Sequence, residues 1–474
     1  MKLRHDALYA SRRSPVLARN MVSTSQPLAA QAGLRMLLAG GNAADAALAS
    51  AIALTVVEPT GNGLGSDAYA IIWDGKELHG LNASGRAPAD WSPERFAGAD
   101  AMPQRGWEAV TTPGAVSAWQ EISAKFGKLP FEKLFEPAIE YATRGFAVSP
   151  IIATLWEKGG DLLGKQPGFA EAFLPGGKAP KAGELFVNKA AAESLIDIAE
   201  TKGESFYRGK LAGKIAAFAK EHGAALSEED LGNHKADWVG TISQSFGNVK
   251  LHEIPPNGQG ISALIALGIL RHTNITDYEP DSVEALHLEI EAMKLAFADM
   301  RAYVADLDYM TDVTVEHLLS DDYLKSRAAL IDANKAQDFK AGAPKHGGTV
   351  YVSAADENGM MVSFIQSNYM GFGSGVVVPG TSISLQNRGH GFSLKDGHPN
   401  LVKGGKRPFQ TIIPAFLMGL DGNPVMSFGV MGGPMQAQGH LQMTLRTQLW
   451  GQDPQTAADA PRWQALSGLN VAVE

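Results

Sequence analysis

The chain has 474 residues, which is too long for one small core and predicts roughly two or three domains or one large layered α/β unit. Its net charge of -9 argues against a nucleic-acid partner, because such a partner requires a basic face. The chain has no cysteine, so disulfides, thiolate metal sites and cysteine nucleophiles are excluded.

The N-terminus is charged and lacks the apolar core of a signal peptide. The longest apolar stretch near it, 46–57, is too short to span a bilayer. We therefore expect a cytoplasmic protein without a membrane partner, unless a leader has been removed.

The clearest helical pattern covers 22–57, with Ser25 as its expected cap. Gly40-Gly41-Asn42 interrupts it, and 43–54 resumes as a helix of small apolar residues that can only be buried. A glycine-rich loop, 58–67, then leads into a strand at 68–73. Because phosphate-binding glycine loops run from strand to helix, this loop favours a structural turn or a segment near an active site over a nucleotide site.

The middle of the chain is mostly helical at 115–235, then has a strand pattern at 236–254 and a long amphipathic helix at 282–305. A polar connection with a short helix follows at 312–348, where we expect an exposed, mobile segment. The remainder is rich in strands, which we expect at 349–354, 360–366, 382–386, 411–418 and 425–430.

Thr349 begins the first of these strands directly after Gly347 and Gly348. If the Gly348–Thr349 bond breaks, Thr349 gains a free α-amine beside its hydroxyl, and a threonine activated by its own N-terminal amine is a known nucleophile type. The segment taken alone favours a glycine turn that enters a strand.

A hairpin turn at 355–359 returns the chain to Thr349, in one of two registers. A two-residue turn would place Asn368 opposite Thr349, and a three-residue loop with Gly359 in the left-handed conformation would place Ser367 there. A later turn at Gly432 and Gly433 has the pattern of an oxyanion hole, although a structural turn is favoured when this segment is taken alone.

Motifs in a fixed order along nearly the whole chain resemble the γ-glutamyltranspeptidase family of N-terminal-nucleophile hydrolases. Before Thr349 they are Gly40-Gly41-Asn42-Ala43-Ala44-Asp45-Ala46, Val57-Glu58-Pro59-Thr60-Gly61, Ser84-Gly85-Arg86-Ala87-Pro88, Pro113-Gly114, Pro255-Pro256-Asn257-Gly258 and Glu291-Ala292-Met293-Lys294-Leu295-Ala296-Phe297-Ala298-Asp299. From the junction onward they are Gly348-Thr349, Phe372-Gly373-Ser374-Gly375, Lys406-Arg407-Pro408 and Gly432-Gly433.

The resemblance implies a four-layer αββα sandwich, with additional helices from the large-subunit portion, made as one precursor that cuts itself before the threonine. The large and small subunits would be 1–348 and 349–474, forming one intertwined unit. Thr349 would be the nucleophile, Gly432 and Gly433 the oxyanion hole, and Ser367 the hydroxyl that binds the nucleophile, which favours the three-residue hairpin loop. Arg86 matches the arginine that binds the substrate carboxylate.

Several positions depart from true transpeptidases. Gln410-Thr411 replaces the serine pair that holds the α-carboxylate, and the segment 387–393 contains Arg388 but no acid, so it would repel an α-ammonium rather than bind it. The segments 366–373 and 435–440 are similar to the branch that includes oxamate amidohydrolase and cephalosporin acylases. We therefore expect Asn368, Tyr369, Arg388, Gln410 and Thr411, together with Arg86, to bind an anionic acyl group without a recognised α-amine.

The small subunit of the family usually continues beyond the point where this chain stops, after 469–474. A truncated small subunit would expose apolar strand edges, which puts stability and self-processing in question. An uncleaved, non-catalytic proenzyme scaffold is therefore one alternative function, and a genuine γ-glutamyltransferase or glutathione hydrolase is another.

The favoured function is a self-cleaving amidohydrolase or acyltransferase that acts on a small-molecule amide through an acyl-enzyme. We expect no cofactor and no metal, since His252, His287, His390 and His440 lack ligand spacing. The partners expected are the two subunits of the same precursor, and the sequence leaves homo-oligomerisation open.

Overall fold

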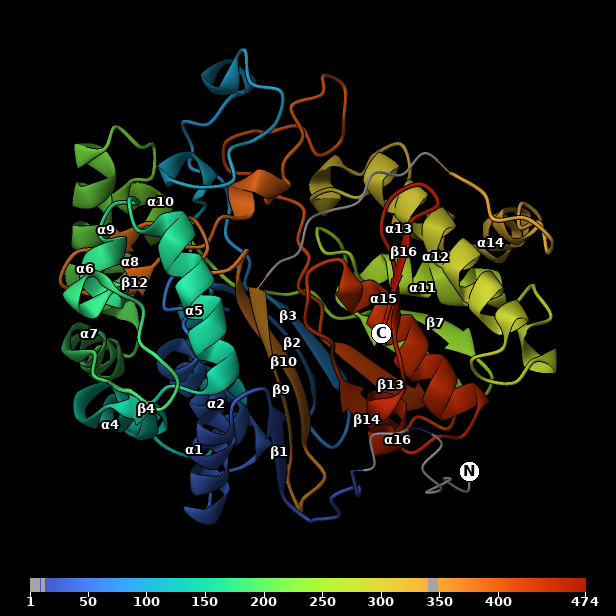
Figure 1. The fold of residues 1–474 in the computed structure, drawn as a ribbon, viewed down its shortest axis with the longest axis horizontal. Helices are drawn as coiled ribbons and strands as arrows, with labels where there is room; N and C mark the ends of the chain where they lie inside the picture. The colour runs from blue at the N-terminus through green and yellow to red at the C-terminus, as the bar shows by residue number, and fades with distance from the viewer. Residues whose placement is uncertain (1–8, 10–12, 340–347) are drawn as a thin grey trace.

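The computed structural model describes residue 9, residues 13–339 and residues 348–474. Two β-sheets lie face to face in the centre of the molecule, and helices cover the outer face of each sheet (Figure 1). Two regions with sequence-based expectations lie outside the described residues. They are the charged N-terminus and the end of the connection before Gly348, where a mobile segment is expected.

The first sheet is antiparallel and has the strand order β1-β9-β10-β2-β3-β6. These strands are β1 (Met21–Thr24), β9 (Gly348–Ala355), β10 (Met361–Tyr369), β2 (Asp67–Trp73), β3 (Leu78–Asn82) and β6 (Asp237–Trp238). Strands from before and after Thr349 therefore share one sheet, with β9 and β10 inserted between β1 and β2.

The second sheet has the order β14-β13-β8-β7, again antiparallel. Its strands are β14 (Pro424–Phe428), β13 (Ala415–Gly419), β8 (Val249–Glu253) and β7 (Ile242–Phe246). Short two-stranded ladders join β4 (Phe146–Ala147) to β5 (Leu185–Phe186), β11 (Val377–Val378) to β12 (Ile383–Ser384) and β15 (Trp463–Ala465) to β16 (Val471–Val473).

Sixteen α-helices are found in the described part of the chain. They are α1 (Pro27–Leu38), α2 (Ala43–Val57), α3 (Ala115–Phe126), α4 (Glu136–Arg144), α5 (Pro150–Leu163), α6 (Phe169–Phe173), α7 (Lys189–Glu200), α8 (Glu204–Arg208), α9 (Lys210–Glu221), α10 (Glu228–Gly232), α11 (Gly260–Leu270), α12 (Val283–Tyr303), α13 (Val315–Leu318), α14 (Asp321–Ala328), α15 (Met435–Thr444) and α16 (Pro454–Asp459).

The alternation of side chains along the strands produces four layers. Ala70 and Ile72 of β2 belong to the core that contains α2, whereas Tyr69 of the same strand packs in the core between the sheets. On the other sheet, Phe416 faces that middle core, and Leu417 faces the core built with α11 and α12. The α/β four-layer sandwich expected from the sequence is confirmed.

The all-small helix expected after Gly40-Gly41-Asn42 is confirmed as α2, which is buried on nearly every side and capped by Asn42. The cap expected at Ser25 is wrong. Gln26 occupies the N-cap of α1 and makes no side-chain capping bond, and Pro27 is the first residue of the helix. The Ser25 hydroxyl instead donates to Glu58 Oε2 at 2.6 Å, which joins the start of α1 to the loop after α2.

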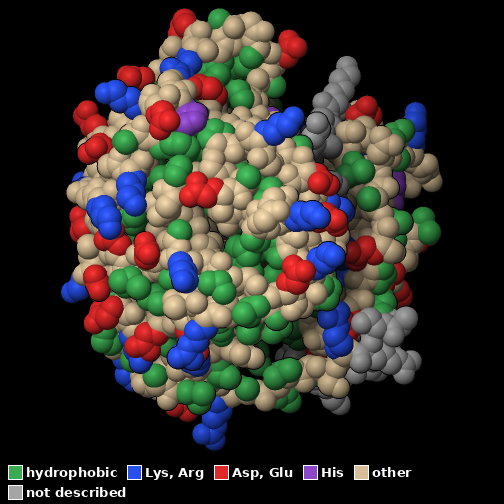
Figure 2. All heavy atoms as spheres, turned by 60° about the vertical axis from the view of Figure 1, so that its left-hand side comes forward, with side chains coloured by type: hydrophobic (Ala, Val, Ile, Leu, Met, Phe, Trp, Pro, Cys, Tyr) green, Lys and Arg blue, Asp and Glu red, His purple; other side chains and the backbone are tan. Residues whose placement is uncertain are grey.

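The strand expected at 411–418 begins only at Ala415, because backbone groups before it bond elsewhere. The Gln410 N–H donates to the Asn257 carbonyl, and the Ile413 N–H donates to Gln436 Oε1. This irregular segment lies near the start of β2 and the end of β10, since Gln410 Nε2 donates to Asp67, which pairs with Ser367. Lys and Arg side chains are interspersed with Asp and Glu on the face shown in Figure 2, so that face has no continuous basic surface.

Candidate active site

The hairpin of β9 and β10 places Ser367 opposite Thr349. Val350 pairs with Gln366, and the register shifts by one residue before Gly348 pairs with Tyr369. The loop contains three residues, since the Asp356 N–H donates to the Met360 carbonyl at 3.1 Å, and Gly359 has a φ of 91°. Of the two registers left open by the sequence, the three-residue loop is therefore the one observed.

The Thr349 hydroxyl is buried and has two side-chain contacts. It donates to Ser367 Oγ at 3.3 Å and accepts from Gln436 Nε2 at 3.4 Å. Ser367 Oγ also accepts the Tyr369 N–H at 2.7 Å, and Tyr369 has a φ of 78°, which is unusual for a bulky residue. The shift in strand register thus turns the chain so that Ser367 is fixed beside Thr349.

The Gly432–Gly433 turn is joined to Gln436, which contacts this hydroxyl. Its φ values of 111° and 61° are ones that glycine adopts readily. The Gly433 carbonyl accepts the Gln436 N–H at 3.1 Å and Gln259 Nε2 at 2.8 Å. Because Gln436 contacts Thr349, these bonds hold the glycine turn and the start of α15 next to the candidate nucleophile.

The glycine-rich loop after α2 also reaches the candidate nucleophile. A Cβ atom on Gly61 would lie 3.3 Å from the Thr349 carbonyl oxygen, so this loop packs directly against the start of β9. The Gly61 carbonyl accepts the Asn368 N–H at 3.2 Å. The loop therefore packs against the candidate nucleophile, which agrees with the expectation of a structural turn or a segment near an active site.

Arg388 is a fully buried cation in this region. Its Nη1 donates to Thr411 Oγ1 at 2.9 Å, and its guanidinium lies 4.7 Å from the centre of the Tyr369 ring. The Nε and Nη2 atoms of Arg388 are buried and have no hydrogen-bond partner among the described residues. Burial lowers the pKa of Arg388 to about 10, although the negative charge of Asp67 opposes this effect.

Asp67 at the start of β2 is the acidic partner in this cluster. It accepts Gln410 Nε2 at 2.6 Å and the Gly85 N–H at 3.1 Å. Burial raises the pKa of Asp67 to about 6, while the charge of Arg388 and these hydrogen bonds act in the opposite direction. The site thus holds a buried cation with donors that no described residue satisfies, and a buried carboxylate whose pKa is raised.

The other residues expected to bind substrate differ in whether their side-chain polar groups already have partners within the protein. The Asn368 amide is already bonded to Ser66 Oγ and Ser384 Oγ, so it ties the hairpin end to the glycine-rich loop and to β12. The side chain of Arg86 is 42% exposed and contacts Asp306, Asp237 and the Gly405 carbonyl. Their roles in substrate binding stay predictions, as does that of Tyr369.

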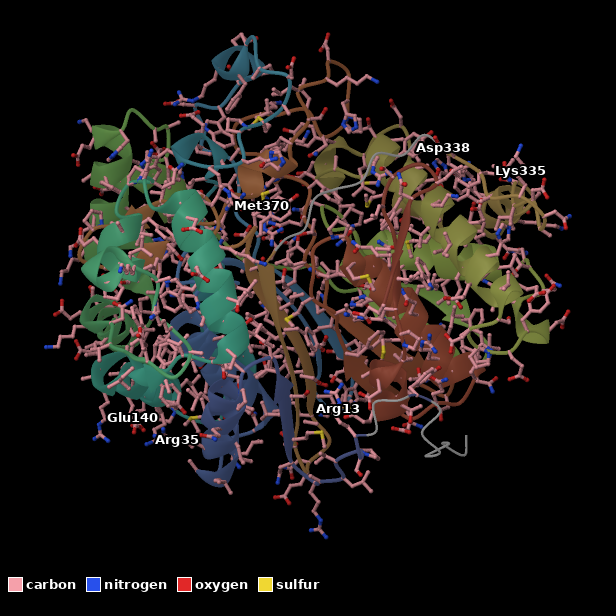
Figure 3. All side chains as sticks on the ribbon, in the orientation of Figure 1. Arg13, Arg35, Glu140, Lys335, Asp338 and Met370 are labelled. Carbon is pink, nitrogen blue, oxygen red and sulfur yellow. The ribbon has the colours of Figure 1, made fainter. Side chains whose placement is uncertain are left out.

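The remaining family motifs form a framework behind the site. The Asn257 side chain donates to the Pro408 carbonyl at 2.7 Å and accepts from the Tyr69 hydroxyl at 2.9 Å. Arg407 donates to the Ser84 carbonyl and pairs with Asp237 at 2.8 Å. In Figure 3, Met370, which follows β10, lies at the upper end of the central sheet, far from the Arg35–Glu140 pair at the lower left.

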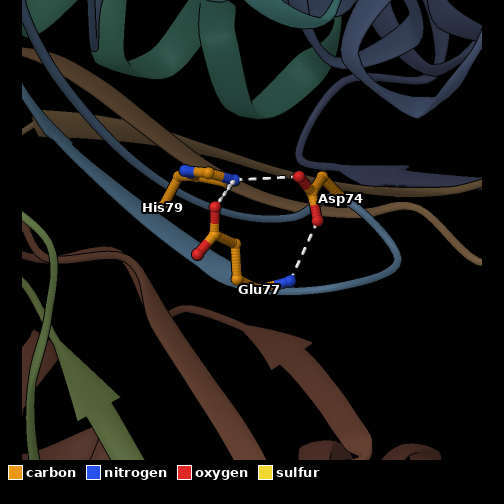
Figure 4. Close-up of side chains that lie close together, drawn as sticks. All are labelled: Asp74, Glu77 and His79. Atoms are coloured by element: carbon orange, nitrogen blue, oxygen red, sulfur yellow. Dashed lines mark hydrogen bonds and ion pairs between the residues drawn. The ribbon is translucent and has the colours of Figure 1, made fainter.

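Asp74, Glu77 and His79, at the turn from β2 to β3, are the group that could hold a metal ion within the described residues (Figure 4). Lys125 Nζ lies 3.2 Å from His79 Nδ1, and since an ammonium only donates, His79 Nε2 carries the proton and donates to Asp74 at 3.0 Å. Burial alone would raise the pKa of Asp74, but backbone N–H groups of Glu77 and Lys76 and the His79 bond lower it to about 2. The arrangement fits a stabilised turn better than a cation site.

Sequence reasoning missed three residues that build the site, namely Gln436, Gln259 and Asp67. Gln436 lies three residues after the Gly-Gly turn, a spacing that places it in the first turn of a helix and facing back toward that turn. Gln259 and Asp67 gave no such signal, because their partners come from segments distant in sequence.

Comparisons with known proteins all point to one family. The sequence profile of the family described as gamma-glutamyltranspeptidase matches residues 29–474. The chain is 36% identical to the glutathione hydrolase-like YwrD proenzyme of Bacillus subtilis, with 95% of this chain and 86% of that protein covered. It is 37% identical to the oxamate amidohydrolase proenzyme of Klebsiella pneumoniae, with the same coverage of 95% and 86%.

Among solved structures, the cephalosporin acylase from Bacillus halodurans is similar to this fold with a TM-score of 0.94 and 48% identity. The match covers 100% of this chain and 88% of the acylase chain. None of the helices in the described part of the molecule has the length and apolarity needed to cross a membrane.

Proposed function

Since the chain belongs to the gamma-glutamyltranspeptidase family, we propose that it is a self-cleaving amidohydrolase whose nucleophile is Thr349. The contact of the Thr349 hydroxyl with Ser367 and Gln436, beside the Gly432–Gly433 turn, is the observation that carries this proposal. Cleavage of the Gly348–Thr349 bond would produce a large subunit, 1–348, and a small subunit, 349–474, whose strands interleave in the first sheet.

In the proposed reaction, Thr349 Oγ attacks the amide carbonyl, and its proton passes to the Thr349 α-amine directly or through a water. The N–H groups of Gly432 and Gly433 stabilise the developing oxyanion, and one such donor is worth about 3–4 kcal/mol of barrier. The C–N bond breaks as the leaving amine takes the proton, which leaves an ester on Oγ. Water or an acceptor amine then attacks the ester and restores the hydroxyl.

We propose that the acyl group is anionic and lacks an α-ammonium. This is supported by Arg388, which is buried and whose Nε and Nη2 atoms have no hydrogen-bond partner in the described part of the chain, in a cluster that reaches Thr411 and Gln410. The Arg388 guanidinium would repel a second cation at these donors, whereas a carboxylate would satisfy it bidentately.

Two matched anilides test the choice of acyl group. A glutaryl anilide and a γ-glutamyl anilide differ in the α-amine alone, and release of the aniline is followed for each with the cleaved enzyme. The proposal expects the glutaryl compound to be preferred in kcat/KM. A preference for the γ-glutamyl compound would instead identify a genuine γ-glutamyltransferase or glutathione hydrolase.

A further inference from the structure

Gln436 contacts the candidate nucleophile but has no part in the reaction as described so far. We infer that its side-chain amide is a catalytic hydrogen-bond donor to Thr349 Oγ, an inference that rests on the proposed function. Gln436 is fully buried in the first turn of α15, and its Nε2 lies 3.4 Å from Thr349 Oγ1.

The hydrogen bond at Gln436 Oε1 determines the orientation of this side-chain amide. Gln436 Oε1 accepts the Ile413 N–H at 3.0 Å, and a backbone N–H can only donate. The oxygen must therefore face Ile413, and the NH₂ group must face Thr349. Because the segment before β13 is irregular, the Ile413 N–H is not used in the sheet and instead fixes the direction of the amide.

In the uncut chain the hydrogen of the Thr349 hydroxyl points to Ser367 Oγ, and one lone pair of its oxygen receives the Gln436 N–H. After cleavage the hydrogen passes to the Thr349 α-amine during attack, while the Gln436 N–H remains directed at Oγ. The amide keeps its proton throughout the reaction and strengthens its bond wherever Oγ carries negative charge. Such charge develops on Oγ when the ester C–O bond breaks during hydrolysis of the acyl-enzyme, so Gln436 assists the departure of Oγ.

Gln436→Glu tests this role, because a carboxylate still accepts the Ile413 N–H but has no donor for Thr349. Loss of a hydrogen bond to a charged group predicts a decrease in kcat of about 10- to 100-fold at about pH 8, with less change in KM. The acylated small subunit should accumulate and be visible as a mass adduct with a glutaryl anilide. Lowering the pH protonates the introduced carboxyl and restores a donor, so the deficit relative to wild type should become smaller.

Gln438→Glu is the matched control. Gln438 is also buried on α15, its Oε1 accepts the Ala465 N–H at 2.7 Å, and its Nε2 donates to backbone carbonyls instead of Thr349. The Gln438→Glu variant should turn over the substrate at close to the wild-type rate and should not accumulate the acylated small subunit. Gln436→Met, which removes the donor without adding a charge, should show the same adduct without the recovery at low pH.

Wild-type turnover, no adduct and a wild-type pH profile in Gln436→Glu would overturn the inference, and so would equal effects in Gln438→Glu. Failure of the proposed function gives a different result, because Thr349→Ala would then still be cut after Gly348 or remain active, or the wild type itself would stay uncut. If Thr349→Ala is inert while Gln436→Glu is normal, Thr349 remains the nucleophile and only the role of Gln436 is lost.

Discussion

The hydroxyl groups of Thr349 and Ser367 lie 3.3 Å apart across a hairpin, one at the start of β9 and the other near the end of β10. The three-residue loop determines this relationship, because a shift of one residue would place Asn368 there instead. Ser367 Oγ also accepts the Tyr369 N–H, so two hydrogen bonds fix the position of the Ser367 hydroxyl.

Ser367→Ala should slow self-cleavage. The substitution removes the acceptor that orients the Thr349 hydroxyl, and one hydrogen bond of about 1–1.5 kcal/mol corresponds to a decrease of roughly tenfold. The appearance of the two fragments with time measures the rate. Ser367→Thr retains the hydroxyl and should cleave close to the wild-type rate, and equal rates in all three proteins would contradict the role given to Ser367.

Arg388→Met should lower kcat/KM for a glutaryl anilide on the order of 100-fold, because a desolvated guanidinium binds a carboxylate strongly. Self-cleavage needs no substrate carboxylate and should continue. Arg86→Met is the comparison, since Arg86 is half exposed and already paired with acids. If the loss occurs in Arg86→Met and not in Arg388→Met, Arg86 is the residue that binds the acyl carboxylate.

The rate of amide hydrolysis should rise with pH through about 7–8, the reference range of an α-amine, because the base must be neutral. A stopped assay of the cleaved enzyme across this range measures the profile. A rate that stays flat would argue against the α-amine of Thr349 as the base.

Glu58→Gln should stabilise the protein at alkaline pH. Burial raises the pKa of Glu58 to about 7, while its bond from Ser25 acts in the opposite direction. A raised pKa means that the folded chain binds the proton more tightly, so this contribution to stability is fully present below the unfolded pKa of Glu58 and is lost as pH rises through about 7. The free-energy advantage of Glu58→Gln should therefore grow by about 2 kcal/mol between about pH 5 and pH 8.

Denaturant unfolding at the two pH values measures that advantage. Glu157→Gln removes an exposed carboxylate and serves as the control, with the same small effect expected at both values. An advantage of Glu58→Gln that does not change with pH would show that folding does not raise the pKa of Glu58.

Local patterns predicted the elements that position the site. The small apolar residues of α2 indicated a buried helix, and alternation after Gly348 indicated β9. The register around Ser367 was narrowed by the family resemblance, since the turn residues allowed two loops. The late start of β13 could not be predicted, because it depends on Asn257 and Gln436 taking backbone groups of a segment that reads as a strand.

The candidate active site could be predicted only in part, because some of its residues are brought in by tertiary contacts. Thr349, Ser367 and the Gly432–Gly433 turn follow motifs, whereas Asp67 and Gln259 enter through tertiary contacts that no local pattern indicates. The capping role expected for Ser25 failed because its hydroxyl bonds to Glu58, a partner 33 residues away in the chain.

Intact-mass spectrometry of the purified protein after prolonged incubation, beside Thr349→Ala, tests the assignment of Thr349 most directly. The proposed function predicts two fragments that meet at Gly348 and Thr349 in the wild type and a single uncut chain in Thr349→Ala. A single uncut chain in both proteins would contradict it and support a non-catalytic proenzyme.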